Sequence, residues 1–162
     1  MRTVRELQTV VESGRLPRRL PVGAVSPGFR GTDLRTGAGI DSSDLIGRRV
    51  VVLFLSDGCP TCRRLADGTR RVPVEPGQTR IAVCHGGARE ASTFVDLLAS
   101  DIAVLADSDG AVFSAFAITG TPAVVVVDEM GTVAGSGGPR HSGELAALVS
   151  TGRDQPLPAV TR

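Results

Sequence analysis

The chain of 162 residues contains no tryptophan, tyrosine, lysine or asparagine, and its aromatic content is five phenylalanines. Because large rings are so few, valine, leucine, isoleucine and alanine must fill the interior, which favours an α/β packing. All eighteen basic residues are arginine, and 17 acidic residues leave a formal net charge of +1. A nearly neutral chain has no field that would attract nucleic acid or an anionic membrane, so we expect neither as a partner.

Cysteine is also scarce, since the chain has three. Three cysteines cannot form a disulfide framework, because one must stay unpaired in a monomer, and we expect a monomer. The number favours a catalytic or metal-binding pair. No apolar run near the start is long enough for a signal peptide or a membrane span, so we expect a soluble cytoplasmic protein, unless a leader has been removed.

The length suits one domain with a core of its own. Residues 1–28 are predicted to precede it as a helix and a proline-rich linker, with apolar residues at helical spacing over 2–12. Residues 29–152 are predicted to form the domain itself. Residues 153–162 are predicted to be a flexible tail.

The apolar pattern of the domain alternates strands with helices, which predicts an α/β fold with a central sheet. The run "VVVLFLS" over 50–56 is typical of a strand that is covered on both faces. A strand-helix-strand unit almost always closes right-handed with parallel strands. We predict a hairpin over 29–40 that turns at Thr36 and Gly37, a turn or short helix over 41–47, strands over 50–56, 80–84 and 102–107, helices over 59–71, 88–99, 109–118 and 142–152, and a second hairpin over 121–137.

The stretch "FLSDGCPTCRRLA" places two cysteines two residues apart where the buried strand ends and a helix begins. Cys59 stands at the predicted helix N-terminus, where unpaired backbone amides and the helix dipole favour a thiolate. Pro60 suits the first turn because it needs no amide partner. Cys62, one turn further along, is within reach of Cys59 but better shielded, as a resolving thiol must be.

A zinc site is the alternative for this pair, but it needs further ligands. The rest of the chain offers Cys84, His85 and His141, without a second pair of closely spaced cysteines, so a redox pair is favoured. Cys84 ends the second parallel strand, at the same edge of the sheet as Cys59. It is either a third redox thiol or a small buried residue, and we favour the buried residue. His85 is interpreted as a loop residue.

Together, "VVVLFLS", "CPTC" at a helix start and "GTP" before a Val-rich hairpin resemble the thioredoxin superfamily. The stretch "PGFRGTDLRTGAGIDSSDLIGRRVVVLFLS" is similar to the membrane-associated thiol-disulfide reductases of the TlpA type. The stretches "FLSDGCPTCRRL" and "GTPAVVVVDEMGTVAG" also resemble the methylamine-utilisation accessory (MauD-like) branch. The resemblance covers residues 27–150 and implies a thioredoxin-like fold, a central mixed sheet flanked by helices.

This resemblance also implies a thiol-disulfide oxidoreductase without metal or organic cofactor. Cys59 matches the attacking nucleophile and Cys62 the resolving cysteine. Thr121 and Pro122 match the cis-proline corner that receives an extended substrate segment, with Pro60 and Thr61 beside it. The implied partners are a client protein with a disulfide or free thiols and a redox-donor protein. A membrane partner and an extracytoplasmic role are further implications, because relatives of this kind usually work outside the cytoplasm.

The sequence departs from the thioredoxin pattern at two positions. Gly58 stands where thioredoxins carry tryptophan, and Leu53 stands where they carry a buried acid, so efficient general disulfide reduction is in doubt. A peroxidase site would need proline and threonine at fixed positions ahead of the cysteine, where this chain has Val52 and Ser56.

A function of another class also stays open. The chain could serve as a non-catalytic maturation factor or as a Cu/Zn metallochaperone that uses Cys59, Cys62 and His141.

Overall fold

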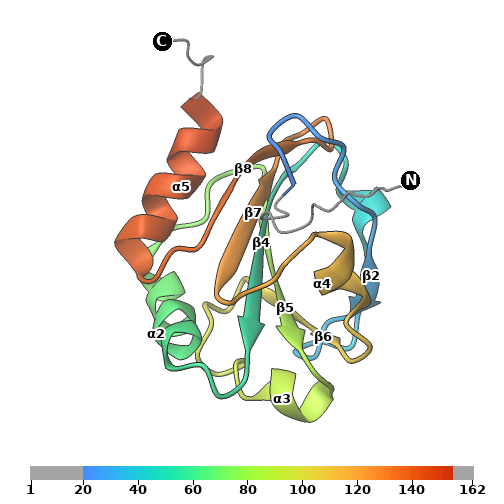
Figure 1. Cartoon of the computed structure of the whole chain (residues 1–162), viewed down its shortest axis with the longest axis vertical. Helices are drawn as coiled ribbons and strands as arrows, with labels where there is room; N and C mark the ends of the chain where they lie inside the picture. The colour runs from blue at the N-terminus through green and yellow to red at the C-terminus, as the bar shows by residue number, and fades with distance from the viewer. Residues whose placement is uncertain (1–19, 155–162) are drawn as a thin grey trace, which may run out of the picture.

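The computed structural model of the chain describes residues 20–154, so the helix predicted over 2–12 and most of the predicted tail lie outside the described residues. A five-stranded mixed sheet forms the centre of the molecule, in the strand order β6-β5-β4-β7-β8 (Figure 1). β4, β5 and β6 are parallel to one another, whereas β7 is antiparallel to both β4 and β8. The strands are β4 (Arg49–Ser56), β5 (Gln78–His85), β6 (Ala103–Asp107), β7 (Ala123–Val127) and β8 (Val133–Gly137).

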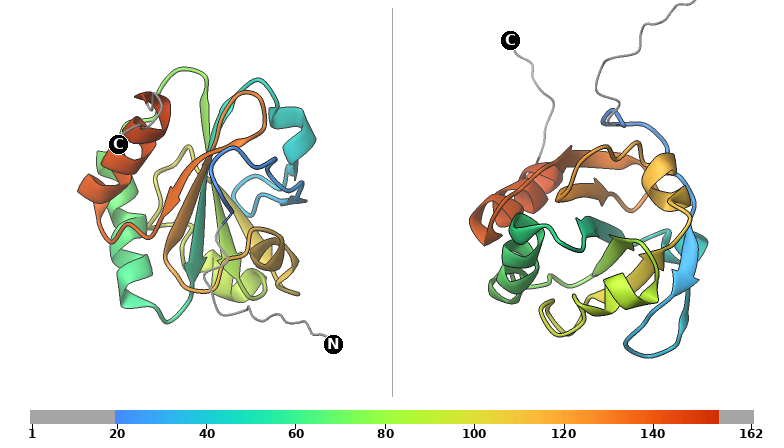
Figure 2. Two further views of the ribbon diagram at one scale, coloured as in Figure 1. Left: turned by 45° about the horizontal axis from the view of Figure 1, so that its top comes forward. Right: turned by 60° about the horizontal axis from the view of Figure 1, so that its bottom comes forward.

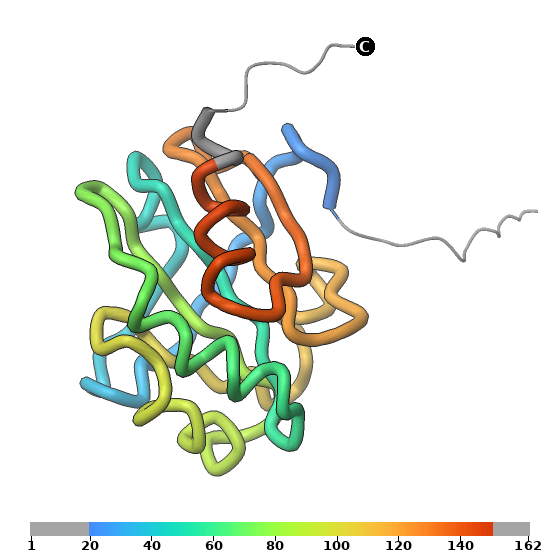
Figure 3. Tube along the Cα trace, turned by 90° about the vertical axis from the view of Figure 1, so that its left-hand side faces the viewer, coloured from blue at the N-terminus to red at the C-terminus, as the bar shows by residue number. Residues whose placement is uncertain are grey.

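The other elements cover the two faces of this sheet. α2 and α5 lie side by side over one face, as Figures 1 and 3 both show, and α4 and the hairpin β2-β3 lie over the other. The predicted hairpin over 29–40 is confirmed as this two-stranded sheet. The helices and the remaining strands are β2 (Arg30–Thr32), β3 (Gly39–Asp41), η1 (Ser42–Leu45), α2 (Pro60–Gly68), η2 (Thr69–Arg71), α3 (Ala88–Ser92), α4 (Ala111–Ala115) and α5 (Ser142–Asp154).

The side chains of β4 show why its sequence has no alternation of polar and apolar residues. Val51, Leu53 and Leu55 point into the core under α2 and α5, and the residues between them point into the core under α4. Phe54 packs there with Phe113, with ring centroids 5.2 Å apart. A central strand with a strand on each side and helices on both faces has no solvent-facing positions, as the sequence predicted.

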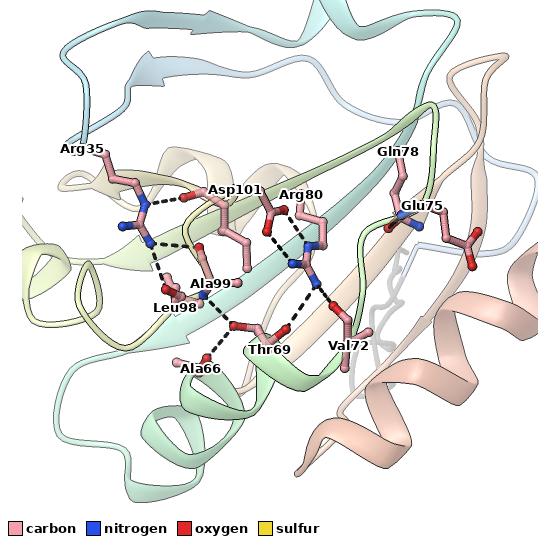
Figure 4. Close-up of polar contacts among 11 residues, drawn as sticks. Arg35, Ala66, Thr69, Val72, Glu75, Gln78, Arg80, Leu98, Ala99 and Asp101 are labelled. Carbon is pink, nitrogen blue, oxygen red and sulfur yellow. Dashed lines mark hydrogen bonds and ion pairs between the residues drawn. The ribbon is translucent and has the colours of Figure 1, made fainter.

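The helix predicted over 88–99 is wrong in its extent, because α3 ends at Ser92. Beyond this point the backbone continues in tight turns, in which the amides of Phe94 and Val95 bond to carbonyls three residues back. The carbonyls of Leu98 and Ala99 accept hydrogen bonds from the guanidinium of Arg35 (Figure 4). These turns bury Phe94 and Leu98 without a regular helix.

The helix predicted over 109–118 is also shorter in the structure. The Asp107 carboxylate accepts the amides of Val112 and Phe113 at the start of α4, at 3.1 and 2.9 Å. The helix ends at Ala115, and Ala117 has a positive φ of 58°. A left-handed residue turns the chain away from the helix direction and leads it toward β7.

Residues 20–34 contact the outer edges of the sheet. On one side, Gly23 and Ala24 exchange backbone hydrogen bonds of 2.8 Å with Val133 of β8. On the other, the Leu34 amide donates to the Val104 carbonyl of β6 at 2.9 Å, and the Val104 amide donates to Asp33 Oδ1 at 3.0 Å. None of the described helices has the length and apolar character that a membrane span requires.

Candidate active site

The two cysteines of the CPTC stretch lie at the carboxyl edge of the parallel strands. β4 ends at Ser56 and β5 at His85, which are opposite each other in the sheet register. The turn from β4 into α2 passes through Gly58, whose φ of +81° is a conformation that glycine adopts without steric cost. Figure 2 (right) turns this end of the molecule toward the viewer. Ligands of open α/β sheets collect at such edges.

Cys59 is the N-cap residue of α2 and is partly exposed. Its Sγ accepts the backbone N–H of Cys62 at 3.1 Å. The same sulfur lies 3.9 Å from the carbonyl oxygen of Thr121, to which the thiol donates. A sulfur that accepts an amide at a helix N-terminus is placed where negative charge is stabilised.

Cys62 lies one turn further along α2 and is 0% exposed. Burial, followed by the hydrogen bond with Cys59, raises the pKa of Cys62 to about 11. The neighbouring backbone of Ser56 and side chain of Thr121 act to lower the pKa of this thiol. Cys62 therefore keeps its proton at neutral pH, next to a more exposed partner.

Thr121 and Pro122 form a loop that faces this pair. The peptide bond between them is cis, and the Thr121 hydroxyl donates to Ser56 Oγ at 3.0 Å. The fold thus brings Thr121 beside Cys59 and Cys62, about sixty positions away in sequence. A cavity of about 700 Å³ lies beside this loop, with Ser56, His85, Phe113, Ile118 and Thr121 in its wall.

The other residues singled out from the sequence have different surroundings. Cys84 is buried on β5, and burial, followed by the interaction with Cys62, raises the pKa of Cys84 to about 12. His85 is exposed, with its ring 5.3 Å from that of Phe113. Pro60 is exposed and Thr61 half-buried in the first turn of α2. The structure therefore places Cys84 behind the pair as a buried thiol.

The structure does not bring His141 together with Cys59 and Cys62 as a metal site. His141 is exposed at the start of α5, where its Nδ1 accepts the amide of Gly143 at 3.2 Å. Over residues 20–154, no group of three or more histidine, cysteine, aspartate or glutamate side chains is arranged to hold a metal ion. The prediction that His141 could join the cysteines is wrong, because this residue caps a helix.

Sequence reasoning missed the part that Ser56 plays in the site. Its hydroxyl accepts from Thr121, and its backbone contacts the Cys62 thiol. The available signal was its place as the single polar residue that ends the apolar run of β4.

Comparison with families of known proteins gives a match over most of the chain. The model of the family described as Redoxin matches residues 21–144. The chain belongs to the Redoxin family. Among curated proteins, none matches the chain.

Solved structures similar to this Redoxin-family chain share its architecture. The structure of dsbF from Mycobacterium tuberculosis is 28% identical, with a TM-score of 0.67 over 76% of this chain and 94% of that chain. A secreted disulfide oxidoreductase of Mycobacterium tuberculosis is 26% identical, with a TM-score of 0.61 over 74% of this chain and 96% of that one.

A thiol:disulfide interchange protein of the thioredoxin family from Chlorobium tepidum is 23% identical. Its TM-score is 0.66, over 80% of this chain and 96% of that chain. The fold is therefore thioredoxin-like, with a central mixed sheet flanked by helices, as the sequence predicted.

Proposed function

We propose that the chain is a thiol-disulfide oxidoreductase that exchanges disulfides with a protein partner through Cys59 and Cys62. The observation that carries this proposal is the contact of Cys59 Sγ with the Cys62 amide at 3.1 Å, at the N-terminus of α2. It combines a partly exposed sulfur with a buried thiol one turn away. Similarity to a secreted disulfide oxidoreductase of Mycobacterium tuberculosis, 26% identical, supports the same function.

In the proposed reaction, the Cys59 thiolate attacks one sulfur of a client disulfide. The other client sulfur leaves as a thiolate and takes up a proton, and a mixed disulfide joins Cys59 to the client. Cys62 then loses its proton and attacks Cys59 Sγ, which releases the second client thiol. The chain is left with a Cys59–Cys62 disulfide, which a redox-donor protein reduces. The reverse sequence of steps oxidises a client dithiol.

The client segment is proposed to bind along the backbone of Thr121, next to Pro122. An extended peptide can pair with an exposed backbone segment through main-chain hydrogen bonds. Pro60 and Thr61 follow Cys59 directly, at the start of α2. Membership in the TlpA type or the MauD-like branch, a cytoplasmic or extracytoplasmic location and the monomeric state stay predictions.

A glutathione redox titration with alkylation and mass spectrometry tests this proposal. We expect one two-electron transition, confined to Cys59 and Cys62, while Cys84 remains a thiol. A midpoint near about −270 mV would indicate a reductant and one near about −120 mV an oxidant. The Cys84→Ala variant is the matched control and is expected to titrate like the unmodified chain. The proposal is wrong if Cys59 and Cys62 never pair, or if Cys84 takes the place of either.

A further inference from the structure

A second cavity, of about 520 Å³, lies at the end of the sheet that is opposite the two cysteines. Val50 and Val52, near the start of β4, line this amino-end cavity together with Val127 of β7, and all three are buried. Cys59 follows the other end of β4. Phe29 adds an aromatic ring to the wall. A cavity of this size with an apolar wall is typical of a binding site.

Three exposed apolar side chains surround the mouth of the amino-end cavity. Val25, Ile46 and Met130 are 79%, 63% and 81% exposed. Val25 pairs with Thr132, so the loop that carries it passes beside the turn between β7 and β8 (Figure 1). Met130 precedes Gly131 in this turn, and a Cβ added at Gly131 would lie 3.0 Å from Ile46 Cδ1. Large apolar side chains that gather on one surface indicate that another segment covers them.

The sequence offers a segment with a matching apolar side. The helix predicted over residues 2–12 lies outside the described residues. Val4, Leu7, Val10 and Val11 fall on one side of such a helix. Because isolated helices shorter than about 12–15 residues are marginal in water, this helix needs a surface on which to pack.

We propose that the predicted helix of residues 2–12 packs over the amino-end cavity of its own chain and covers Val25, Ile46 and Met130. The apolar side of the helix and the three exposed side chains then leave water together, and this burial stabilises the contact. The inference goes beyond the proposed function and does not rest on it, because the amino-end cavity and the cysteines lie at opposite ends of β4.

The connecting chain is long enough for this contact. The described residues begin at Leu20, and Ser26 lies in the wall of the amino-end cavity. Six residues of extended chain cover about 20 Å, so Leu20 and Ser26 are no further apart than that. The connection from residue 12 to Leu20 can span up to about 26 Å. The end of the predicted helix therefore reaches the mouth of the cavity.

Charge favours the same placement. Residues 1–19 contain five arginines and two glutamates, so this segment is positive and the rest of the chain is negative. Asp44 and Glu129 are exposed next to residues that line the cavity, and neither makes an ion pair within residues 20–154. The Glu129 carbonyl accepts the amide of Gly47 at 2.9 Å, which joins the two stretches that carry these acids. Two unpaired carboxylates thus face an arginine-rich segment.

The arginines in the wall of the amino-end cavity already have partners. Arg30 pairs with Asp41, with nitrogen and oxygen 3.6 Å apart. Arg48 Nε donates to Thr79 Oγ1 at 2.6 Å. These contacts direct both guanidinium groups to other acceptors, so they offset little of the attraction by the free acids.

Limited digestion with trypsin tests the proposal on the full chain. Trypsin cleaves after arginine, and the bond after Arg5 lies inside the predicted helix. Mass spectrometry gives the rate of this cleavage in the full chain and in a free peptide of residues 1–19, and the ratio of the two rates measures protection. We expect cleavage to be at least about tenfold slower in the full chain, because it requires the population in which the helix has left the cavity. The ratio should be the same at all protein concentrations.

Two variants test the surface. Ile46→Glu places a charge at the mouth of the amino-end cavity and should reduce the protection at least about threefold, since an unpaired charge is unfavourable to bury. Val74→Glu is the matched control, because Val74 is also exposed, at 41%, and lies outside this cavity. It should leave the protection unchanged. Circular dichroism and urea unfolding check that each variant folds.

Two further variants test the segment. Val11→Gln removes an apolar side chain from the packing side of the predicted helix and should also reduce the protection. Thr9→Gln lies on the opposite side and should not. Glutamine is a good helix former, so neither change disfavours the helix itself. Each variant is compared with a free peptide that carries the same substitution.

Each outcome supports or overturns the inference. Equal rates in the full chain and the free peptide would show that residues 2–12 do not pack on the chain. Protection that Ile46→Glu leaves unchanged would place the segment on another surface. Protection that appears only at high protein concentration would assign the cavity to a second copy of the chain. The redox titration of Cys59 and Cys62 does not depend on any of these results, so the proposed function is judged separately.

Discussion

Gly58 sets the backbone conformation immediately before Cys59. Its φ of +81° requires a glycine-like backbone, and a Cβ placed there would meet no atom within 4 Å. The backbone conformation, and not a lack of space for a side chain, therefore requires glycine at position 58. Where thioredoxins present an indole ring beside the first cysteine, this chain presents bare backbone. We expect a client to be recognised on this side through main-chain contacts, with little contribution from aromatic stacking.

Cys84 gives a prediction about a single thiol. Because only the thiolate reacts and burial raises the pKa of Cys84 to about 12, iodoacetamide should modify Cys84 at pH 8 at least about 100-fold more slowly in the folded chain than in urea. Trypsin cleaves after arginine and separates residues 81–89, with Cys84, from residues 50–63, with the other two cysteines. Mass spectrometry of the two peptides over time gives both rates. Equal rates in the folded and unfolded chain would show that Cys84 is accessible.

The sequence and the structure differ most informatively at Ser56 and Thr121. The spacing of Cys59 and Cys62 at a helix start indicated a redox pair from local residues alone, and the structure places the two side by side. Thr121 and Pro122 became candidates through the family resemblance. The bond between Thr121 and Ser56 joins residues 65 positions apart, and it exists because β7 pairs with β4 in one register. Neither residue propensities nor sequence spacing determine that register. The contact between the two hydroxyls could therefore not be predicted without the structure.

At the scale of elements, one arginine of the β2-β3 hairpin holds the irregular turns after α3. Arg35 Nε donates to the Ile102 carbonyl at 2.8 Å, and Nη2 donates to those of Leu98 and Ala99 (Figure 4). We expect Arg35→Gln to lower the free energy of unfolding by about 1–3 kcal/mol, because it removes charged donors from partly buried carbonyls. Urea unfolding followed by circular dichroism measures the change.

A matched control for this variant lies on the same hairpin. Arg30→Gln removes an exposed ion pair with Asp41, in which nitrogen and oxygen are 3.6 Å apart. Exposed pairs of this kind contribute about 0–1 kcal/mol, so the midpoint of this control should move little. If Arg35→Gln were as mild as Arg30→Gln, the turns after α3 would owe their position to other contacts, such as the burial of Phe94 and Leu98.

The same turns explain why the helix over 88–99 was predicted too long. Apolar spacing reports which residues are buried, and Phe94 and Leu98 are buried as the pattern indicated. It does not report where the carbonyls find their donors. Here the donors to the carbonyls come from Arg35, more than sixty positions earlier, and the Ala99 amide donates to the buried hydroxyl of Thr69. Strands, which depend on long apolar runs, were predicted more closely than these short helices.

For the whole molecule, the absence of lysine and tyrosine leaves cysteine as the main side chain that titrates near pH 9 to 11, so the pH dependence of stability in this range reports on the thiols. Unfolded thiols release their protons near pH 9, whereas folded Cys62 and Cys84 hold theirs to about pH 11 and 12. Between pH 9 and 11 the folded state therefore binds more protons than the unfolded state, and its stability falls as pH rises. We expect the loss to be about 1.4 kcal/mol per pH unit for each thiol.

Urea unfolding at a series of pH values between 8 and 11 measures this slope. Cys84→Ala removes one of the two buried thiols and should lower the slope by about half, since each group contributes the same linkage term. The free energy of unfolding of this variant below pH 8, where the thiols are protonated in both states, measures the separate cost of removing the Cys84 side chain. A slope unchanged in this variant would mean that Cys84 releases its proton at the same pH in the folded and unfolded chain.

The contacts of residues 23–34 with β6 and β8 have a consequence for how copies of the molecule meet. An exposed strand edge is a template for pairing with another chain, and proteins usually discourage this with charge or by covering the edge. A net charge of +1 provides little repulsion between copies. Resistance to edge-to-edge aggregation therefore depends on the backbone bonds at Val133 and Val104, which an incoming strand would have to displace.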